Sequence, residues 1–164
     1  IVLVTGVQTC ALPISSTSAH PPTPPIPSNF PQFPIPTASI QPRTLTNLLP
    51  AAGPYSQAIK TGTTIYCSGQ IPCTPSGEIF TLATHNVGQM TEQCITNLSA
   101  VLEAAGSSLK KVVKVNVFIT TMDNFAEMNA TYEKFFSHKP ARSCVAVKEL
   151  PKGVPVEIEC IALV

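Results

Sequence analysis

The stretch KVVKVNVFITTMDNFAEMNATYEKFF, residues 111–136, decides the fold class of this 164-residue chain. Residues 111–120 are rich in β-branched side chains and alternate apolar with polar positions, a pattern typical of a strand. Asp123 then stands as the predicted N-cap of a helix that ends near Phe136. The apolar residues of this helix lie on one stripe: Phe125, Met128, Tyr132, Phe135 and Phe136.

The segments on both sides extend this strand-and-helix pattern. Residues 84–105 place apolar side chains at helical spacing and end at Gly106, a residue favoured at helix C-termini. Alternating or β-branched runs predict strands at 43–49, 58–60, 64–71, 143–148 and 155–163. This order predicts an α+β sandwich in which two helices cover one face of a mixed six-stranded sheet. A homo-oligomer is the expected cover for the other face.

Residues 1–42 differ in composition from the rest of the chain. They contain no Asp, Glu, Lys or Arg and hold ten of the 17 prolines. Prolines at this density prevent helices and central strands, so residues 15–42 are predicted to form a disordered or polyproline II tail. Residues 1–14 include VTGVQTCALPI, which resembles the translation of a sequencing-library adapter, and we interpret them as an assembly artefact. The predicted domain spans residues 43–164.

Composition also excludes several classes of function. The net charge is +1 and the basic residues are scattered, so the chain lacks a nucleic-acid footprint. No apolar stretch reaches the roughly 18 residues of a membrane span. Six cysteines and three histidines form no CxxC motif or Cys/His pair, so we expect free thiols, no metal and no cofactor. Free thiols favour the cytoplasm, with the mitochondrion as an alternative location.

Arg142 is the first candidate for a binding residue. It is one of only two arginines in the chain and stands near the start of the apolar string PARSCVAV, residues 140–147. A charged group at the start of a buried strand needs a partner. The paired N–H donors of a planar guanidinium match the two oxygens of a carboxylate. The position therefore predicts a carboxylate ligand. A salt bridge to Glu157 or Glu159 is the alternative.

Glu157 is the candidate for moving a proton. Because Glu157 and Glu159 are two residues apart in a predicted strand, both face the same way, and like charges raise a carboxyl pKa toward acid–base use. A solvated strand face is the alternative. Cys144 shares its direction with Arg142, but no histidine pairs with it to form a nucleophile. We therefore interpret Cys144 as a pocket wall and water contact.

Five strings, in order and at matching spacing, resemble the reactive intermediate deaminase family, also called the Rid or YjgF family and once L-PSP endoribonucleases: GPYSQA, CSGQIP, NATYEKFF, PARSCVAV and VEIECIAL. The resemblance covers residues 43–164. It implies a chorismate mutase-like (YjgF-like) fold and a homotrimer around a central barrel, with active sites between subunits. The implied activity is that of a 2-iminobutanoate/2-iminopropanoate deaminase, which hydrolyses imines and enamines from pyridoxal phosphate enzymes to keto acids and ammonia.

The resemblance also implies which residues form the site. The implied catalytic residues are Arg142, Glu157 and Cys144. The residues implied to bind the carboxylate of a small imino or keto acid are Tyr55, Ser68, Gly69, Asn129 and Arg142. Core packing is the alternative for Tyr55. The link at 137–139 is shorter than in several family members, so loop contacts near Arg142 are expected to differ. Two other functions stay open: an endoribonuclease that inhibits translation, and a non-catalytic trimer that binds small ligands.

Overall fold

A five-stranded mixed sheet forms the centre of the computed structural model, which describes residues 54–164. Only β3 and β4 run parallel, and the other neighbours are antiparallel. The strands lie in the order β1 (Ala58–Thr61), β2 (Thr64–Gln70), β5 (Val156–Leu163), β3 (Val112–Ile119) and β4 (Ala141–Ala146). These strands confirm the five strands predicted within the described part. The sixth, predicted at 43–49, lies outside the described residues, as does the predicted tail.

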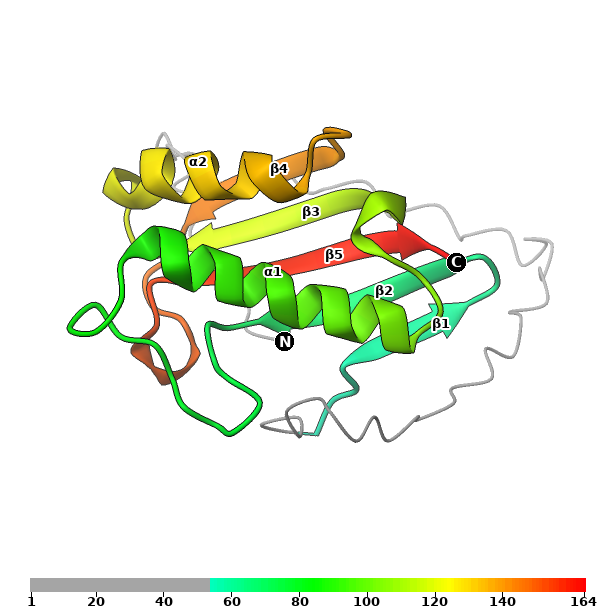
Figure 1. The fold of residues 1–164 in the computed structure, drawn as a ribbon, viewed down its shortest axis with the longest axis horizontal. Helices are drawn as coiled ribbons and strands as arrows, with labels where there is room; N and C mark the ends of the chain where they lie inside the picture. Colours follow the sequence, from blue (N-terminus) through cyan, green and yellow to red (C-terminus); the bar gives the residue numbers. More distant parts are fainter. Residues whose placement is uncertain (1–53) are drawn as a thin grey trace, which may run out of the picture. The chain divides into compact units, whose positions relative to one another are not determined.

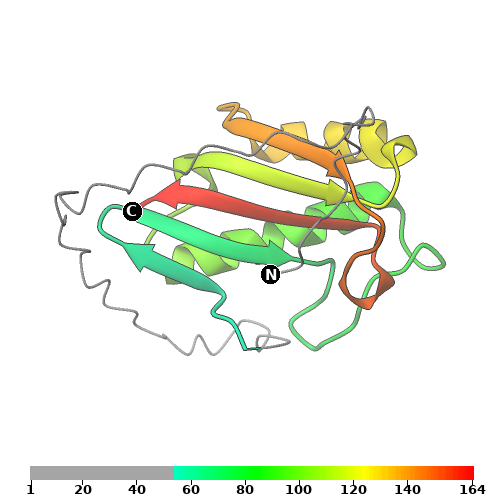
Figure 2. The ribbon, with the colours of Figure 1, turned by 180° about the vertical axis from the view of Figure 1, so that it is seen from behind.

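Two helices lie over the same face of this sheet (Figure 1), and the view from behind shows that no helix of the described residues covers the other face (Figure 2). They are α1 (Val87–Ala104) and α2 (Phe125–Phe135). Short 3₁₀ turns at Leu109–Lys111, Met122–Asn124 and Pro151–Gly153 connect the elements. The predicted α+β sandwich with both helices on one face is therefore confirmed.

The core lies between the helices and the sheet. Along β5 the buried residues alternate with half-buried ones, because successive side chains of a strand point to opposite faces. Val156, Ile158, Cys160 and Ala162 are buried among the core residues, whereas Glu157 and Glu159 lie between them in the sequence. From α1 the core receives Met90, Cys94, Ile95, Leu98, Val101 and Leu102.

The beginning of α2 differs from the prediction. Asp123 was predicted as the N-cap, but it lies inside the 3₁₀ turn Met122–Asn124, and Asn124 occupies the N-cap position. Thr121 precedes that turn and its hydroxyl accepts a hydrogen bond from the backbone N–H of Asp123 at 3.2 Å. The Asp123 prediction was wrong because a tighter turn, capped by Thr121, enters the helix first.

The start of α1 carries a capping box that offers a test of the fold. The Asn86 side-chain oxygen accepts from the N–H of Gln89 at 2.8 Å, and the Gln89 side chain accepts from the N–H of Asn86 at 3.0 Å. Asn86→Ala should lower the free energy of unfolding by about 1 kcal/mol, because it leaves a helix-terminal N–H without its partner. Urea unfolding followed by circular dichroism measures the change.

Asn124→Ala is the matched control, because Asn124 has the same position at α2 but makes no side-chain capping bond. It should shift the unfolding midpoint much less. Equal shifts for the two variants would contradict the importance of the α1 capping box.

Candidate functional site

Arg142 extends from β4, the last strand of the sheet order, toward α2. Its Nη1 donates a hydrogen bond to Asn129 Oδ1 at 2.7 Å. Its guanidinium carbon lies 4.7 Å from the centroid of the Tyr132 ring and 5.7 Å from that of Phe125. These three α2 residues are spaced i, i+4 and i+7, so they share one helix face. The helix therefore holds the guanidinium at the edge of the sheet.

The predicted alternative, a salt bridge from Arg142 to Glu157 or Glu159, is absent from the described residues. The one ion pair within 54–164 joins the exposed side chains of Lys148 and Glu149 at 3.9 Å. Glu159 instead accepts a hydrogen bond from Asn116 Nδ2 at 2.8 Å. The charge of Arg142 is thus left without a carboxylate among the described residues.

Cys144 follows two residues after Arg142 on β4 and is half-buried like it. Burial raises the pKa of its thiol, and the nearby charge of Arg142 lowers it by less. The thiol therefore stays protonated at neutral pH, which is the poor nucleophilic form. This state agrees with the interpretation of Cys144 as a pocket wall.

Glu157 lies on the opposite face of the sheet from Arg142. Arg142 stands beside Val115 in the register, and Val115 stands beside Cys160; both neighbours are buried under the helices. Glu157 instead stands beside Phe118, an odd number of residues along β3 from Val115, so its side chain points to the other face of the sheet. Neighbours in a row share a face, so one chain presents Arg142 and Glu157 on different sides of its sheet.

Gly69 makes room for the carboxyl group of Glu157. The register between β2 and β5 shifts between Cys67 and Gln70, which marks a β-bulge around Gly69. A Cβ atom at position 69 would lie 1.9 Å from Glu157 Oε1, so a larger residue would displace this carboxyl group. Burial raises the pKa of Glu157 and the charge of Glu159 raises it further. The carboxyl group is thus placed beside bare backbone with an increased affinity for a proton.

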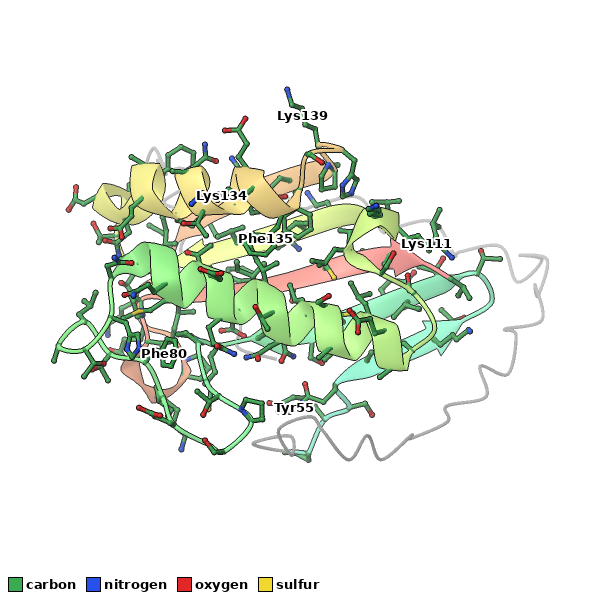
Figure 3. The ribbon with its side chains drawn as sticks, in the orientation of Figure 1. Tyr55, Phe80, Lys111, Lys134, Phe135 and Lys139 are labelled. Atoms are coloured by element: carbon green, nitrogen blue, oxygen red, sulfur yellow. The ribbon has the colours of Figure 1, made fainter. Side chains whose placement is uncertain are left out.

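Ser68 connects the bulge to the segment that contains Tyr55. The Ser68 hydroxyl donates to the carbonyl of Ser56 at 2.6 Å, and the Ser68 N–H donates to the carbonyl of Gln57 at 3.0 Å. Tyr55 precedes this segment, is exposed, and lies near the beginning of the described chain (Figure 3). Its exposure does not match the alternative that Tyr55 packs in the core of one chain.

The predicted site residues therefore divide into two groups. Asn129, Arg142 and Cys144 form the arginine group, on the helix side of the sheet at β4 and α2. Ser68, Gly69 and Glu157 form the glutamate group, at the bulge of β2 and on β5, and hydrogen bonds tie the Tyr55 segment to them. Strands β3 and β5 lie between β4 and β2, so the described fold does not bring the two groups together.

Sequence reasoning assigned Phe125 and Tyr132 to the core alone and missed their contact with Arg142. The signal was available, since Asn129 was already a candidate and positions 125 and 132 lie on its face of the helix. The spacing could not reveal that β4 pairs in parallel with β3 and so passes beside α2.

The short link before β4 is closed by its own contacts. Lys139 adopts a left-handed conformation with φ 53°, its N–H donates to the carbonyl of Phe136 at 2.9 Å, and its side chain points away from the fold (Figure 3). His138 Nε2 donates to the carbonyl of Val112 at 3.0 Å. The link at 137–139 therefore anchors the start of β4 to β3, and so fixes the backbone that carries Arg142.

Neither helix within 54–164 is long and apolar enough to cross a membrane. The same residues contain no group of three His, Cys, Asp or Glu side chains that could hold a metal ion. All five cysteines of this part are free thiols.

Comparisons with known proteins agree with this fold. Residues 45–164 match the family model described as Endoribonuclease L-PSP. The protein mmf1, mitochondrial, of Schizosaccharomyces pombe is 54% identical over 119 residues, which cover 70% of this chain and 71% of that protein. The Escherichia coli 2-iminobutanoate/2-iminopropanoate deaminase is 44% identical over 124 residues, which cover 72% of this chain and 94% of the relative.

Among solved structures, the crystal structure of Escherichia coli TdcF with bound serine superposes with a TM-score of 0.68 at 38% identity, covering 76% of this chain and 97% of that one. The match of the family model and of these relatives spans most of the chain. The chain therefore belongs to the reactive intermediate deaminase, or Rid/YjgF, family.

Glu157 and Glu159, the two carboxyl groups of β5, allow a test of how charge affects the pKa of Glu157. Glu159→Gln should lower the pKa of Glu157, because it removes a negative charge from the same face and leaves the burial unchanged. Since burial is the larger cause, the pKa should stay above its ordinary value. Nuclear magnetic resonance titration of the Glu157 carboxyl carbon measures the shift.

Glu133→Gln is the control, because Glu133 is exposed on α2. It should leave the titration midpoint of Glu157 in place. A Glu157 midpoint that rises or does not move in Glu159→Gln would contradict the repulsion between the two carboxyl groups.

Proposed function

We propose that this chain is an imine deaminase that hydrolyses 2-iminobutanoate and 2-iminopropanoate to the keto acids and ammonia. The observation that supports it most is Arg142, a half-buried guanidinium held by Asn129 and two rings, without a carboxylate partner among the described residues. The family, its Escherichia coli deaminase and the serine bound to TdcF support a small carboxylate as the ligand.

Arg142 has the donors to bind that carboxylate. A guanidinium carries five N–H donors, and the hydrogen bond to Asn129 uses one on Nη1. Paired donors remain for the two oxygens of the substrate, and each charge-assisted bond contributes about 1.5 to 3 kcal/mol where water is partly excluded. Cys144 lies near the charge of Arg142 and is proposed to form part of the pocket wall.

Glu157 is proposed to move the proton. Hydrolysis adds water to the carbon of the C=N bond, so a base must take a proton from water as the new C–O bond forms. The raised pKa of Glu157 increases its affinity for the proton that it takes from water. The protonated carboxyl group donates this proton to the nitrogen, which gives a carbinolamine. Glu157 then takes the proton of the new hydroxyl group and passes it to the nitrogen, so that the C–N bond breaks as the C=O bond forms and ammonia leaves the keto acid. The Ser68 hydroxyl and Tyr55 are proposed to hold substrate and water, and no cofactor is needed.

The active site is proposed to form between two copies of the chain. Within one chain the arginine group and the glutamate group lie on opposite sides of the sheet. A neighbouring copy that docks on the uncovered face supplies the missing group, as in the homotrimer of the family. That face carries an apolar row of Ile59, Tyr66 and Ile161, which are paired side by side. Ile59 and Tyr66 are 41% and 48% exposed, so a partner gains by covering them.

The central prediction concerns activity. With 2-aminoacrylate generated by a pyridoxal phosphate dehydratase, the wild-type chain should accelerate pyruvate release. Arg142→Ala and Glu157→Gln should each lose most of this acceleration, because one removes the carboxylate partner and the other removes the base. Coupled detection of pyruvate measures the rates, and an Arg142→Ala variant as active as wild type would refute the proposal.

Mixing the two inactive variants tests the site between copies. Each shared site takes one group from each neighbour, so a 1:1 mixture reassembled from unfolded chains should regain about a quarter of the wild-type rate. If both groups acted within one chain, the mixture would stay as inactive as its components.

Assembly has its own test. The wild-type chain should have about three times the mass of a single chain in light scattering. Tyr66→Glu should reduce this mass, because it buries a charge in the apolar row. Lys134→Glu, on an exposed position of α2, should leave the mass unchanged. A wild-type monomer would refute both the homotrimer and the shared site.

An endoribonuclease is the second candidate, favoured by the description of the matching family model. Neither described histidine is placed for this work: His85 stacks on Phe80 at a centroid separation of 3.6 Å, and His138 bonds Val112. RNA cleavage that co-purifies with the wild type and is lost in both Arg142→Ala and Glu157→Gln would favour this candidate.

The compartment is proposed to be the cytoplasm, with the mitochondrion as the alternative. The name of the Schizosaccharomyces pombe relative supports the mitochondrion. Fractionation of the source cells with an antibody to the domain distinguishes the two.

A further inference from the structure

We infer that the ring of Tyr132, with Phe125 as a second and weaker contact, is a positioning element that orients the Arg142 guanidinium for its ligand. This inference rests on the proposed function, because it assigns Arg142 the carboxylate. The Tyr132 ring centroid lies 4.7 Å from the guanidinium carbon, well inside the roughly 6 Å range of cation–π attraction. The Phe125 ring, at 5.7 Å, lies near the limit of that range.

Tyr132 is suited to this task because the core fixes its ring. Its exposed fraction is 6%, and its ring packs against Phe136 at a centroid separation of 4.5 Å and an interplanar angle of 30°. The backbone carbonyl of Tyr132 also accepts from the N–H of Phe136 at the end of α2. A ring that cannot turn gives the cation one preferred face to lie against.

Asn129 and Tyr132 constrain different motions of the same group. The Asn129 side-chain oxygen accepts a hydrogen bond from Nη1 of Arg142 at 2.7 Å, and this bond fixes the position of that one nitrogen. A single hydrogen bond lets the guanidinium plane rotate about it, whereas a ring alongside the plane opposes that rotation. Both contacts together leave the remaining donors aimed in one direction, which a bidentate carboxylate requires.

The ring rather than the hydroxyl of Tyr132 makes this contact. The hydroxyl is buried and has no hydrogen-bond partner among the described residues. Burial raises its pKa to about 12, and Arg142 lowers the pKa by less, so the hydroxyl stays neutral at physiological pH. A phenolate therefore does not pair with Arg142, and removing the oxygen leaves the cation–ring contact in place.

The test compares two substitutions at one position. Tyr132→Leu removes the ring and should raise KM for the imino acid roughly three- to thirtyfold, the range that corresponds to a partly desolvated cation–π contact. Its kcat should stay within about twofold of wild type, because bound substrate still meets Glu157. Tyr132→Phe restores the ring without the oxygen and should return KM to near the wild-type value. Phe125→Leu should raise KM less than Tyr132→Leu.

Loss of a core ring also destabilises the helix, so the kinetics need a matched control. Met128→Ala truncates a fully buried side chain in the core on the same helix. It should lower the melting temperature as Tyr132→Leu does and leave KM unchanged. In an Arg142→Ala background, Tyr132→Leu should have no further effect on KM.

A spectroscopic readout separates this inference from the proposed function. The chain contains two arginines, so its ¹⁵N spectrum shows two side-chain Nε–H signals to assign. Ring currents should displace the Arg142 signal from that of Arg43 in the wild type and in Tyr132→Phe, and the displacement should be lost in Tyr132→Leu.

The outcomes are distinct. An unchanged Arg142 signal and KM in Tyr132→Leu would overturn the positioning role while the deaminase stands. A KM raised equally in Tyr132→Phe would assign the effect to the hydroxyl and would also overturn it. If the wild type lacks deaminase activity but the signal behaves as expected, the proposed function fails and the cation–ring contact stands.

Discussion

The pleat of β5 is the constraint on which the rest of the structure depends. Its even-numbered residues enter the core beneath α1, and its odd-numbered residues include the two glutamates on the uncovered face. A shift of one residue in its pairing would bury Glu157 and Glu159 and expose Ile158 and Cys160, at a cost that no local contact offsets. Hydrophobic burial therefore fixes the position of the Glu157 carboxyl group, and no interaction dedicated to that group is needed.

The arginine group depends on a different principle. Arg142 lies on the last strand of the sheet order, where a side chain can leave the core and meet one face of a helix. Desolvating a cation is costly unless it is paired, and here an amide oxygen and aromatic faces offset part of that cost without neutralising the charge. The half-buried guanidinium thus keeps its attraction for an anion. A carboxylate partner from the same chain would have cancelled it.

Sequence reasoning located every described strand and both α-helices, because alternation and helical spacing report which side chains are buried. It also placed Glu157 and Glu159 on a common face and Cys144 beside Arg142. It failed at the start of α2, where Thr121 and Asp123 both have capping side chains and only the backbone path decides between them. It could not determine that Arg142 and Glu157 lie on opposite faces, since that depends on which strands pair and in which register. The contact between Arg142 and Tyr132 could not be predicted either, because it depends on the pairing of β4 with β3.

The bulge at Gly69 has a consequence for how this sequence can vary. The space that a Cβ atom would occupy there is filled by the end of the Glu157 side chain, so the two positions share one small volume. A side chain at 69 is accommodated when residue 157 is shortened or its flexible end turns away, so the Glu157 carboxyl group keeps its present position only opposite bare backbone. Positions 69 and 157 should therefore covary among homologues, and a relative that has lost one should show relaxed selection on the other.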